Sequence, residues 1–582
     1  MNCKKQNRER KRRRGALRGA ALGFAGLLLS GLMLAPLSVQ AEQRAKGTGA
    51  AVSADLNAER EAAAQQSAKA AQKLRAEGRQ VRAVTYFGEE WPINFWSSEF
   101  RNMDADFAQI REDGFNSIIL CVPWNEFQPR LGGKNSPINE DAVARLRIVM
   151  QKAEAAKLSV FLRLGYTWDY YGNAAIPERY AQLVTSDAVR DAFLAYASRI
   201  YQEVSGFENF AGAFLTWEDF WNYLDEEKRL AGTYFGKSAA KASGYTAYVQ
   251  AHYTEAELTA LYGSRQAAQE AAYPKEKSPA YRLFLEWYDT FLMDLLRDTQ
   301  RVFPDLSFEC RLDAELCSGG AAPSYYAHDA TFDSENASYT SAMLSASMGY
   351  EAGTVLSAEE AAASGRNQLN RLMVTGKPVF VDQFLYMEST PGYENLPKLR
   401  ASEMNTYLKT MGGVFRDLTM GYGIWTYRDY RDNQIYNPGF ALGLDGWTAL
   451  GGVREVQTES GCAAELKKGA SLSQSLKNRN FLSENGMKVR FRITSSAPAS
   501  VQIATDVGTK TVQVGAGEQT ISLTFDKQAK EEVKLALVSG ERVIVDDVRV
   551  YSHVTEGGIY GTDKQPGPYL EGIRALNQAM KG

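Results

Sequence analysis

The feature that most restricts the fold of this chain is an eightfold alternation of short apolar runs and longer amphipathic stretches between residues 81 and 435. The runs are VTYFG (84–88), NSIILCV (116–122), LSVFLRL (158–164), FAGAFLT (210–216), LSFECRL (306–312), YTSAMLS (339–345), PVFVDQF (378–384) and GYGIWTY (421–427). Strands that alternate with helices pair in parallel through right-handed crossovers. Eight such units predict an α/β fold, a closed (β/α)8 TIM barrel. A doubly wound open sheet is the alternative, but no glycine-rich phosphate loop follows the first run.

The segments on either side of the barrel differ from it in amino-acid composition and in hydrophobic pattern. Residues 42–80 are rich in Ala, Gln, Lys and Glu without aromatics, which predicts a linker that is partly helical. Residues 436–555 contain short alternating runs separated by turn residues, which predicts an antiparallel β-sandwich, or jelly roll, inserted in the barrel or appended to it. Residues 556–582 include an amphipathic helix that we expect to return to the barrel as its last helix, against the first and seventh helices.

The first 41 residues have the pattern of a secretory signal peptide. Nine basic side chains precede an apolar stretch, and Val39-Gln40-Ala41 provides a small-residue cleavage site. An uncleaved membrane anchor is the alternative, because the apolar stretch is long for a signal. We therefore expect a secreted, cell-surface or periplasmic protein with no membrane contact after cleavage.

Charge and composition exclude several functions. Cleavage after Ala41 would change the net charge from −3 to −11, which gives no electrostatic basis for binding nucleic acid. Only three histidines occur, with no CxxC or HExxH motif, so the sequence predicts no metal site and no cofactor. Aromatic residues make up 11% of the chain, and such side chains stack on sugar rings.

Carboxylates and aromatic side chains follow most of the eight predicted strands. In a (β/α)8 barrel these positions lie together at the C-terminal mouth, where the active site is found. Acid and carboxylate pairs with aromatic platforms are what glycoside cleavage requires. The candidate substrate-binding residues are Glu90, Trp124, Asn125, Glu126, Arg163, Trp168, Asp169, Asp219, Trp221, Arg311, Asp313, Gln383, Trp425 and Tyr427. Arg163 and Arg311 are of the kind that points inward and fixes carboxylates by ion pairing.

Four of these segments resemble glycoside hydrolase clan A, which includes cellulases, mannanases and β-galactosidases. FLTWEDFWN is similar to the fourth-strand motif of the clan, VPWNEFQP to its second strand, the segment ending in PVFVDQF to its seventh unit, and GIWTYRD to its eighth. The resemblance covers residues 84–430. It implies that Glu218 is the acid/base and that the nucleophile ends the seventh strand.

The seventh strand departs from the pattern of the clan. Gln383 stands at the nucleophile position, and Asp382 precedes it by one residue. Because side chains alternate along a strand, this offset directs Asp382 to the opposite face of a regular strand. Three interpretations are open: a local bulge directs Asp382 to the mouth, Glu388 on the next loop reaches in, or the nucleophile is absent. Asp382 is the residue that we expect to act as nucleophile, within about 5–7 Å of Glu218.

The sandwich resembles carbohydrate-binding modules of the family 4 and 9 type. YNPGFALGLDGWT opens it and VIVDDVRVYS closes it, as in the edges of those modules. Many sandwiches of this kind bind no sugar and only brace a catalytic domain, and Trp447 suits either a packed or an exposed position. Sugar binding by this domain is therefore left open.

Two functions fit the sequence. The first is an exported glycoside hydrolase that cleaves a β-linked polysaccharide or oligosaccharide with retention, through Glu218 and Asp382. The second is a non-catalytic glycan-binding barrel that acts in exopolysaccharide or cell-wall handling. The irregular seventh strand is the feature that separates them.

Overall fold

The computed structural model describes residues 49–581, with gaps. The gaps are residues 99, 101, 132–136, 166–181, 218–233, 276–277, 305, 311–338, 346–349, 351–352, 374–375, 388–394, 459–460 and 477–485. The predicted signal peptide lies outside the described residues. Within them, no helix is both long enough and apolar enough to cross a membrane.

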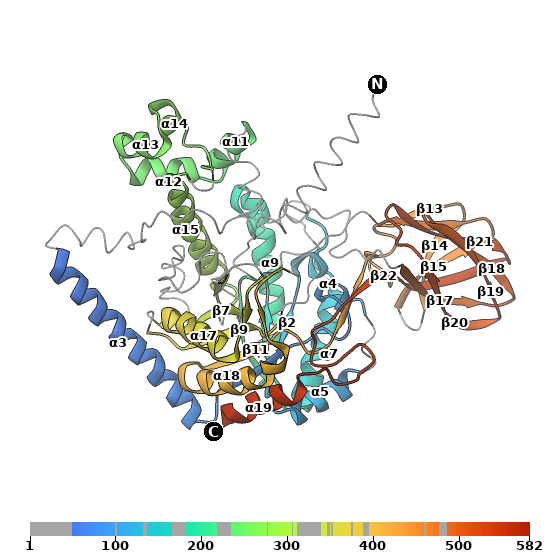
Figure 1. Ribbon diagram of the computed structural model, residues 1–582. Coiled ribbons are helices and arrows are strands. Elements are labelled where there is room, and N and C mark those ends of the chain that lie inside the picture. Colours follow the sequence, from blue (N-terminus) through green and yellow to red (C-terminus); the bar gives the residue numbers. More distant parts are fainter. Residues whose placement is uncertain are drawn as a thin grey trace.

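Eight parallel strands form a closed barrel, which confirms the predicted fold class (Figure 1). Closure depends on the fifth strand, which is divided at Phe308: its first half pairs with β4 and its second half pairs with β7. The strands are β1 (Val81–Thr85), β2 (Ser117–Cys121), β3 (Ser159–Arg163), β4 (Phe210–Phe214), β5 (Leu306–Ser307) with β6 (Glu309–Cys310), β7 (Thr340–Ser345), β9 (Val379–Leu385) and β11 (Gly421–Ile424).

Helices cover the outside of the barrel, because each strand sends an apolar side chain outward at every second position. The interior is filled by a separate set that includes Ile119, Phe161, Phe214 and Phe380. The covering helices are α5 (Met103–Glu112), α7 (Glu140–Ala155), α9 (Asp187–Val204), α15 (Tyr281–Gln300), α17 (Ala358–Leu372), α18 (Met404–Leu418) and α19 (Leu570–Lys581). Short elements complete this part: α4 (Pro92–Phe95), α6 (Trp124–Phe127), β8 (Val355–Leu356), β10 (Lys398–Leu399) and the 3-10 turn η3 (Ala401–Glu403).

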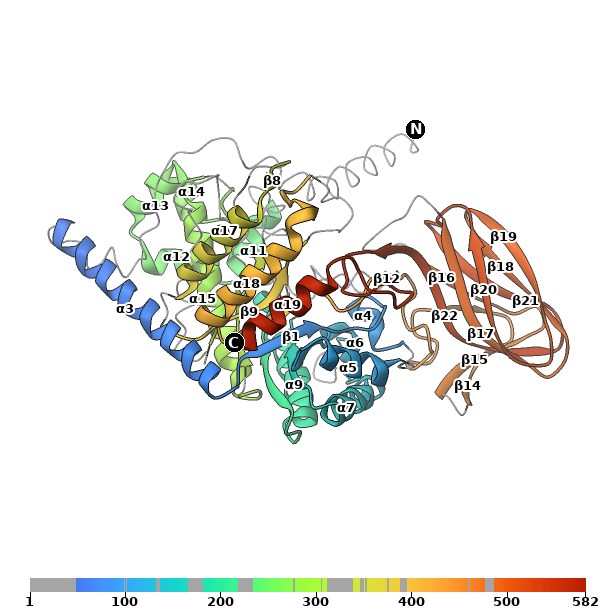
Figure 2. The same cartoon turned by 60° about the horizontal axis from the view of Figure 1, so that its bottom comes forward.

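The helix α19 closes the barrel wall after the sandwich. It packs on α18, where Gly412 allows the backbones to approach: a Cβ there would lie 2.7 Å from the Leu576 carbonyl oxygen. On its other side Arg574 pairs at 2.9 Å with Asp113, the C-cap residue that directly follows α5. Figure 2 shows α19 in this place beside α18 and β1. These neighbours, the seventh and first helices, are the two that the sequence predicts for this segment.

An extra group of helices follows β4 and lies above α15 in Figure 1. Thr254 and Ser264 cap two of them through their hydroxyls, and Thr254 with Glu257 forms a capping box. The helices are α11 (Tyr234–Ala242), α12 (Tyr245–His252), α13 (Glu255–Tyr262) and α14 (Arg265–Glu270).

The segment that the sequence predicts to be a linker is helical over most of its length. Helix α3 (Gly49–Ala76) is rich in Ala, Gln and Lys, which are strong helix formers. Its C-terminal half packs on the barrel: Ala71 is buried, Ser67 donates to the Met373 carbonyl at 3.0 Å, and Arg75 lies 3.8 Å from Asp417. This part of the segment is therefore docked on the barrel.

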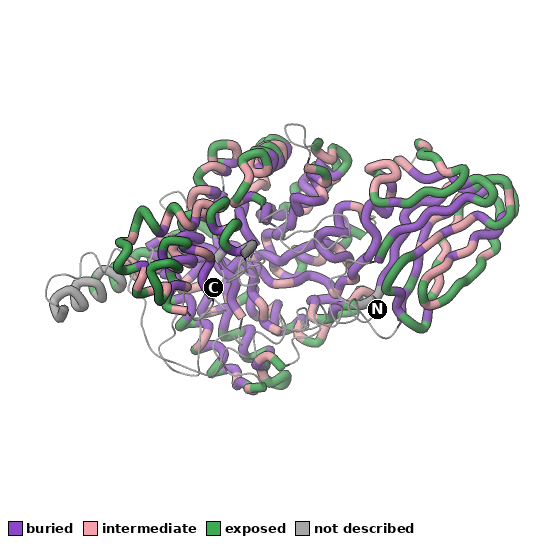
Figure 3. Tube along the Cα trace, turned by 90° about the horizontal axis from the view of Figure 1, so that it is seen from above, coloured by how far each residue is buried: buried purple, intermediate pink, exposed green. Residues whose placement is uncertain are grey.

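Residues 436–555 form a two-sheet sandwich with its own apolar core (Figure 3). One sheet has the order β14 (Val453–Thr458), β15 (Gly461–Lys467), β22 (Arg542–Thr555), β17 (Met487–Ser495), β20 (Gly517–Phe525), and β12 (Tyr430–Asn433) of the connecting segment also pairs with β22. The other has the order β13 (Thr448–Leu450), β16 (Ser471–Ser475), β21 (Glu532–Ser539), β18 (Ala499–Thr505), β19 (Gly508–Val514). Burial alternates along β17, as expected of a strand with one face in a core.

Candidate functional site at the barrel mouth

Four strand ends meet at the C-terminal rim of the barrel. Arg163 ends β3, Trp217 follows β4, Gln383 lies in β9 and Trp425 follows β11. The Trp217 indole nitrogen donates to the Gln383 amide oxygen at 2.6 Å, and the rings of Trp217 and Trp425 are 5.0 Å apart. These four segments therefore lie next to one another at this rim of the barrel.

Strand β9 contains a β-bulge at the positions that the sequence left open. Tyr422 and Ile424 of β11, which are two positions apart, pair with Val381 and Phe384 of β9, which are three positions apart. The pairing of β9 with β7 on its other side shows the same offset of one residue. The strand thus has one residue more than either neighbour between these pairs, and the alternation of side chains is broken. Gly423 makes room for the bulge, because a Cβ there would lie 2.8 Å from the Asp382 carbonyl oxygen.

The bulge directs both Asp382 and Gln383 to the inside of the barrel, where each contacts Arg163. Asp382 forms an ion pair with the Arg163 guanidinium. A carboxylate oxygen of Glu309, on β6, lies 3.2 Å from Nε of Arg163. All three side chains have no exposed surface. Arg163 thus points inward and fixes carboxylates, the arrangement proposed for it from the sequence.

Asp382 is therefore placed differently from what the sequence predicts for a nucleophile. Burial raises the pKa of its carboxyl, although Arg163 and a hydrogen bond with Glu309 act in the opposite direction. Burial lowers the pKa of Arg163, but the charges of Glu309 and Asp382 outweigh it and raise the pKa. Within the described residues this carboxylate is enclosed with its counterion, so its predicted role as nucleophile would require the ion pair to open.

Gln383 occupies the position that the clan resemblance assigns to the nucleophile. Its amide oxygen accepts hydrogen bonds from Trp217 at 2.6 Å and from Arg163 Nη1 at 3.2 Å. Its amide nitrogen lies 3.3 Å from the Met343 sulfur. An amide carries no negative charge and cannot form a glycosyl ester. This amide oxygen thus has two hydrogen-bond donors, and one of them, Arg163, is cationic. A carboxylate oxygen would be equally well satisfied in the same place.

Aromatic rings form a wall beside Gln383. Trp91 lies 6.4 Å from Trp217, 6.1 Å from Trp425 and 5.1 Å from Tyr430, measured between ring centroids. Trp425 is only partly buried, and its peptide bond to Thr426 is cis. Trp425 was predicted from the sequence as a site residue, whereas Trp91, Trp217 and Tyr430 were not. Trp91 and Trp217 nevertheless lie at predicted strand ends.

Three predicted site residues are turned away from the mouth. Trp124 has no exposed surface, since its ring packs 5.1 Å from Phe193 of α9 and its Nε1 donates to Gln128. Tyr427 is buried against Tyr560, at 5.4 Å. Glu90 accepts a hydrogen bond from the hydroxyl of Tyr551 of the sandwich at 2.7 Å. These three side chains are thus engaged in tertiary contacts of the described structure, and their roles in binding stay predictions.

Asn125 and Glu126 lie on the short helix α6 after β2. Asn125 is 1% exposed, and within the described part of the chain neither atom of its amide has a hydrogen-bond partner. A buried amide of this kind is costly unless water or a ligand satisfies it. Glu126 is partly buried near Tyr436, whose pKa is raised by burial and by the charges of Glu126 and Asp445.

The remaining candidates lie outside the described residues. They are Trp168, Asp169, Glu218, Asp219, Trp221, Arg311, Asp313 and Glu388. Their roles stay predictions, as does the distance between Asp382 and Glu218. Across the described ranges, no group of three or more His, Cys, Asp or Glu side chains is arranged to hold a metal ion.

No protein-family model and no curated protein matches this chain. Among solved structures, an apo β-glucosidase is 13% identical over 60% of this chain and 89% of its own, with a TM-score of 0.36. An exo-β-1,4-mannosidase from an Opitutaceae bacterium is 13% identical over 60% of this chain and 53% of its own, with a TM-score of 0.38. A glycoside hydrolase of family 5, subfamily 18, from Bifidobacterium longum is 14% identical over 60% and 70%, with a TM-score of 0.38.

The search also found a family 61 carbohydrate-binding module, solved with β-1,4-galactotriose. It is 18% identical over 21% of this chain and 99% of its own, with a TM-score of 0.18. All these similarities are remote, and the fold described above rests on its own strand pairing.

Proposed function

We propose that this protein is exported and binds a β-linked polysaccharide or oligosaccharide at the C-terminal mouth of its barrel, without cleaving it through Asp382. The observation that carries the proposal is the β9 bulge. It places the Gln383 amide between Trp217 and Arg163, and it encloses Asp382 with its counterion. Retaining hydrolysis needs a carboxylate at this place that can reach the anomeric carbon.

Two further features suit a neutral sugar. The partly buried Trp425 ring, backed by Trp91 and Trp217, provides a platform for the C–H face of a pyranose. The amide of Asn125, for which the described residues supply no hydrogen-bond partner, provides a donor and an acceptor for hydroxyl groups. Ligand sites combine apolar walls with a few such polar groups.

Glycoside hydrolysis is the second candidate. Trp217 directly precedes Glu218, and its hydrogen bond to Gln383 places the end of β4 beside the end of β9. The acid/base role of Glu218 itself rests on the resemblance of FLTWEDFWN to the fourth-strand motif of the clan. A nucleophile would then have to come from Glu388, or from Asp382 after a rearrangement that opens the Arg163 pair.

A binding and turnover screen separates the two functions. The purified protein is titrated calorimetrically with β-glucan, β-mannan, a β-galactoside and the exopolysaccharide of the host, and the release of reducing ends is measured on each. Binding that Trp425→Ala weakens about tenfold or more supports the proposed site. Tyr201→Ala is the control, because Tyr201 is a partly buried aromatic residue of the outer helix α9 whose ring contacts Phe303 and not the described residues of the proposed site. Failure to bind any of these glycans would contradict the proposal.

Turnover would favour the second candidate, and three variants identify its machinery. Glu218→Gln should then reduce turnover by about a thousandfold or more. Glu388→Gln and Asp382→Asn show which carboxylate acts as nucleophile. If the wild type binds without turnover, Gln383→Glu places a carboxylate at the same position. We expect its oxygen to attack C1 of a 2-deoxy-2-fluoroglycosyl fluoride, so that the C1–F bond breaks, fluoride leaves and the glycosyl ester is detected by mass spectrometry.

A further inference from the structure

The described part of the sandwich offers no exposed aromatic platform to a sugar ring. Trp447 is 8% exposed, its ring lies 5.3 Å from Phe440, and its Nε1 donates to the Asn437 carbonyl at 3.1 Å. The other aromatic side chains described between residues 436 and 555 are also buried: Tyr436, Phe491, Phe525 and Tyr551. The contribution of this domain must therefore be sought in its contact with the barrel.

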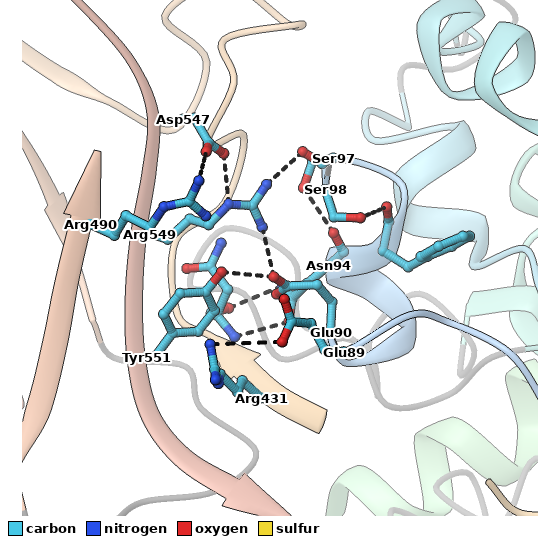
Figure 4. Close-up of polar contacts among 12 residues, drawn as sticks. Glu89, Glu90, Asn94, Ser97, Ser98, Arg431, Arg490, Asp547, Arg549 and Tyr551 are labelled. Carbon is cyan, nitrogen blue, oxygen red and sulfur yellow. Dashed lines mark hydrogen bonds and ion pairs between the residues drawn. The ribbon is translucent and has the colours of Figure 1, made fainter. Parts of the chain in front are cut away.

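That contact is centred on Glu90 (Figure 4). The hydroxyl of Tyr551 donates to Glu90 Oε1 at 2.7 Å, and Arg549 Nη1 lies 3.4 Å from the same oxygen. Tyr551 and Arg549 are both on β22 of the sandwich, whereas Glu90 follows β1 of the barrel. The side chains of Arg549 and Glu90 are 1% and 8% exposed, so the pair is shielded from solvent.

Arg549 is itself held in place from both domains. Its Nε donates to Asp547 at 2.6 Å, and Asp547 also lies 3.6 Å from Arg490 of β17. Its Nη2 donates to the carbonyl of Ser97, just after α4 of the barrel, at 2.7 Å. Figure 4 shows the guanidinium between these groups. The orientation of Arg549 is therefore fixed by partners on two sides of the domain boundary.

Glu90 directly precedes Trp91 of the aromatic wall. The Trp91 backbone N–H donates to the Arg431 carbonyl at 2.9 Å, and Arg431 belongs to β12, which pairs with β22. Asn94 and Asn433 exchange two further hydrogen bonds, of 3.0 and 3.1 Å. The backbone that carries Trp91 is thus attached to the sandwich through a side chain on one side and a strand on the other.

We propose that the sandwich is a positioning domain: Arg549 and Tyr551 hold Glu90 and thereby set the place of Trp91 in the wall where the glycan binds. This inference rests on the proposed function for its effect on binding, whereas the positioning itself can be observed without a ligand. It also explains why a domain with buried aromatic residues is joined so closely to the barrel mouth.

The experiment uses the full chain labelled with 5-fluorotryptophan. The nine tryptophans give separate ¹⁹F resonances, and Trp91→Phe assigns that of Trp91. Tyr551→Phe removes one hydroxyl, and Arg549→Met removes the cation. Tyr253→Phe is the matched control, because the Tyr253 hydroxyl donates to Glu286 of α15 and not to a group at the boundary between the sandwich and the barrel.

We expect the Trp91 resonance to shift or broaden in Tyr551→Phe and Arg549→Met and to stay unchanged in Tyr253→Phe. Loss of the hydroxyl should weaken glycan binding by about three- to tenfold. If neither change at the boundary moves the Trp91 resonance, the positioning role is wrong. If Arg549→Met does not fold, Tyr551→Phe decides alone. A wild type that binds no glycan contradicts the proposed function, while the ¹⁹F shifts still decide the positioning.

Discussion

Two buried arginines, Arg163 and Arg549, form similar ion pairs but have different structural roles. Each is almost completely buried and lies between two carboxylates: Asp382 and Glu309 for Arg163, Asp547 and Glu90 for Arg549. The partners of Arg163 all come from barrel strands. One partner of Arg549 comes from the other domain.

The comparison shows what a buried ion pair contributes. Desolvation of the charges offsets most of their attraction, so such a pair adds little to stability relative to apolar packing, whereas removal of one partner is costly. What the pair provides here is geometry. Arg163 fixes the inward direction of the bulged strand β9, and Arg549 fixes the sandwich against the barrel.

The largest effect is expected from Arg163→Met. The change leaves Asp382 and Glu309 together without a cation in the barrel interior, which should lower the free energy of unfolding by about 3–5 kcal/mol. Chemical denaturation followed by near-UV circular dichroism measures the loss. The loss should be larger at pH 8 than at pH 5, because burial raises the pKa of Asp382, and keeping this carboxyl protonated without its cation costs more free energy at the higher pH. A loss below about 1 kcal/mol would show that the pair is solvated.

The next effect concerns Glu90 and pH. Burial, which outweighs the attraction of Arg549 and Tyr551, raises the pKa of Glu90 from 4.5 to about 7. A raised pKa means that the folded state favours the protonated carboxyl. Its contribution to stability is complete below about pH 4.5 and is lost as the pH rises to about 7, for a total of about 3 kcal/mol.

Glu90→Gln removes this dependence. Denaturation curves between pH 4.5 and 8 should show that the variant gains stability relative to the wild type as the pH rises. Glu255→Gln is the control, because Glu255 is exposed in the helical insertion. Parallel pH profiles for the wild type and Glu90→Gln would mean that Glu90 ionises normally in the folded protein.

A smaller effect is expected from Asp382→Asn. The asparagine side-chain oxygen can still accept a hydrogen bond from Arg163. Arg163 also keeps its ion pair with Glu309, so its positive charge is still balanced. We expect a loss of about 1 kcal/mol in thermal or chemical unfolding, far less than for Arg163→Met. A loss as large as that of Arg163→Met would show that the Asp382 charge is indispensable to the bulge.

The smallest effect is expected from Arg265→Met, which extends the comparison to the surface. Arg265 pairs with Glu255 at 2.6 Å, but the two side chains are 73% and 53% exposed. Solvent screens such a pair, so the denaturation curve of the variant should coincide with that of the wild type within the error of the assay. The same denaturation assay applies, and a change of several kcal/mol would remove the distinction between buried and exposed arginines.

The barrel could be predicted from the sequence because each of its units is local. A run such as NSIILCV alternates faces over seven residues, and the helix after it has a 3.6-residue period. The division of the fifth strand at Phe308 could not be predicted, because it depends on pairing with β4 and β7 at the same time.

The candidate site was predictable only in part. The bulge in β9 was one of three interpretations, and alternation alone could not choose between them. The contact of Arg163 with Asp382 and the missing side chain of Gly423 are long-range features. Trp124 is buried by Phe193, which lies 69 positions later, and nothing near Glu90 in sequence indicates its attachment to Tyr551.

The position of α19 has a consequence for biosynthesis. The last barrel strand, β11, ends at Ile424, but the helix that covers it begins at Leu570, after the whole sandwich has been made. While the ribosome synthesises the intervening segment, the seam between α5 and α18 lacks its cover, so residues such as Leu408 and Tyr422 lack their final neighbours in α19. Nascent chains of this length expose such surface to chaperones and to aggregation. If the chain crosses a membrane unfolded, as its predicted signal implies, the barrel can complete its wall only when the sandwich has emerged on the far side.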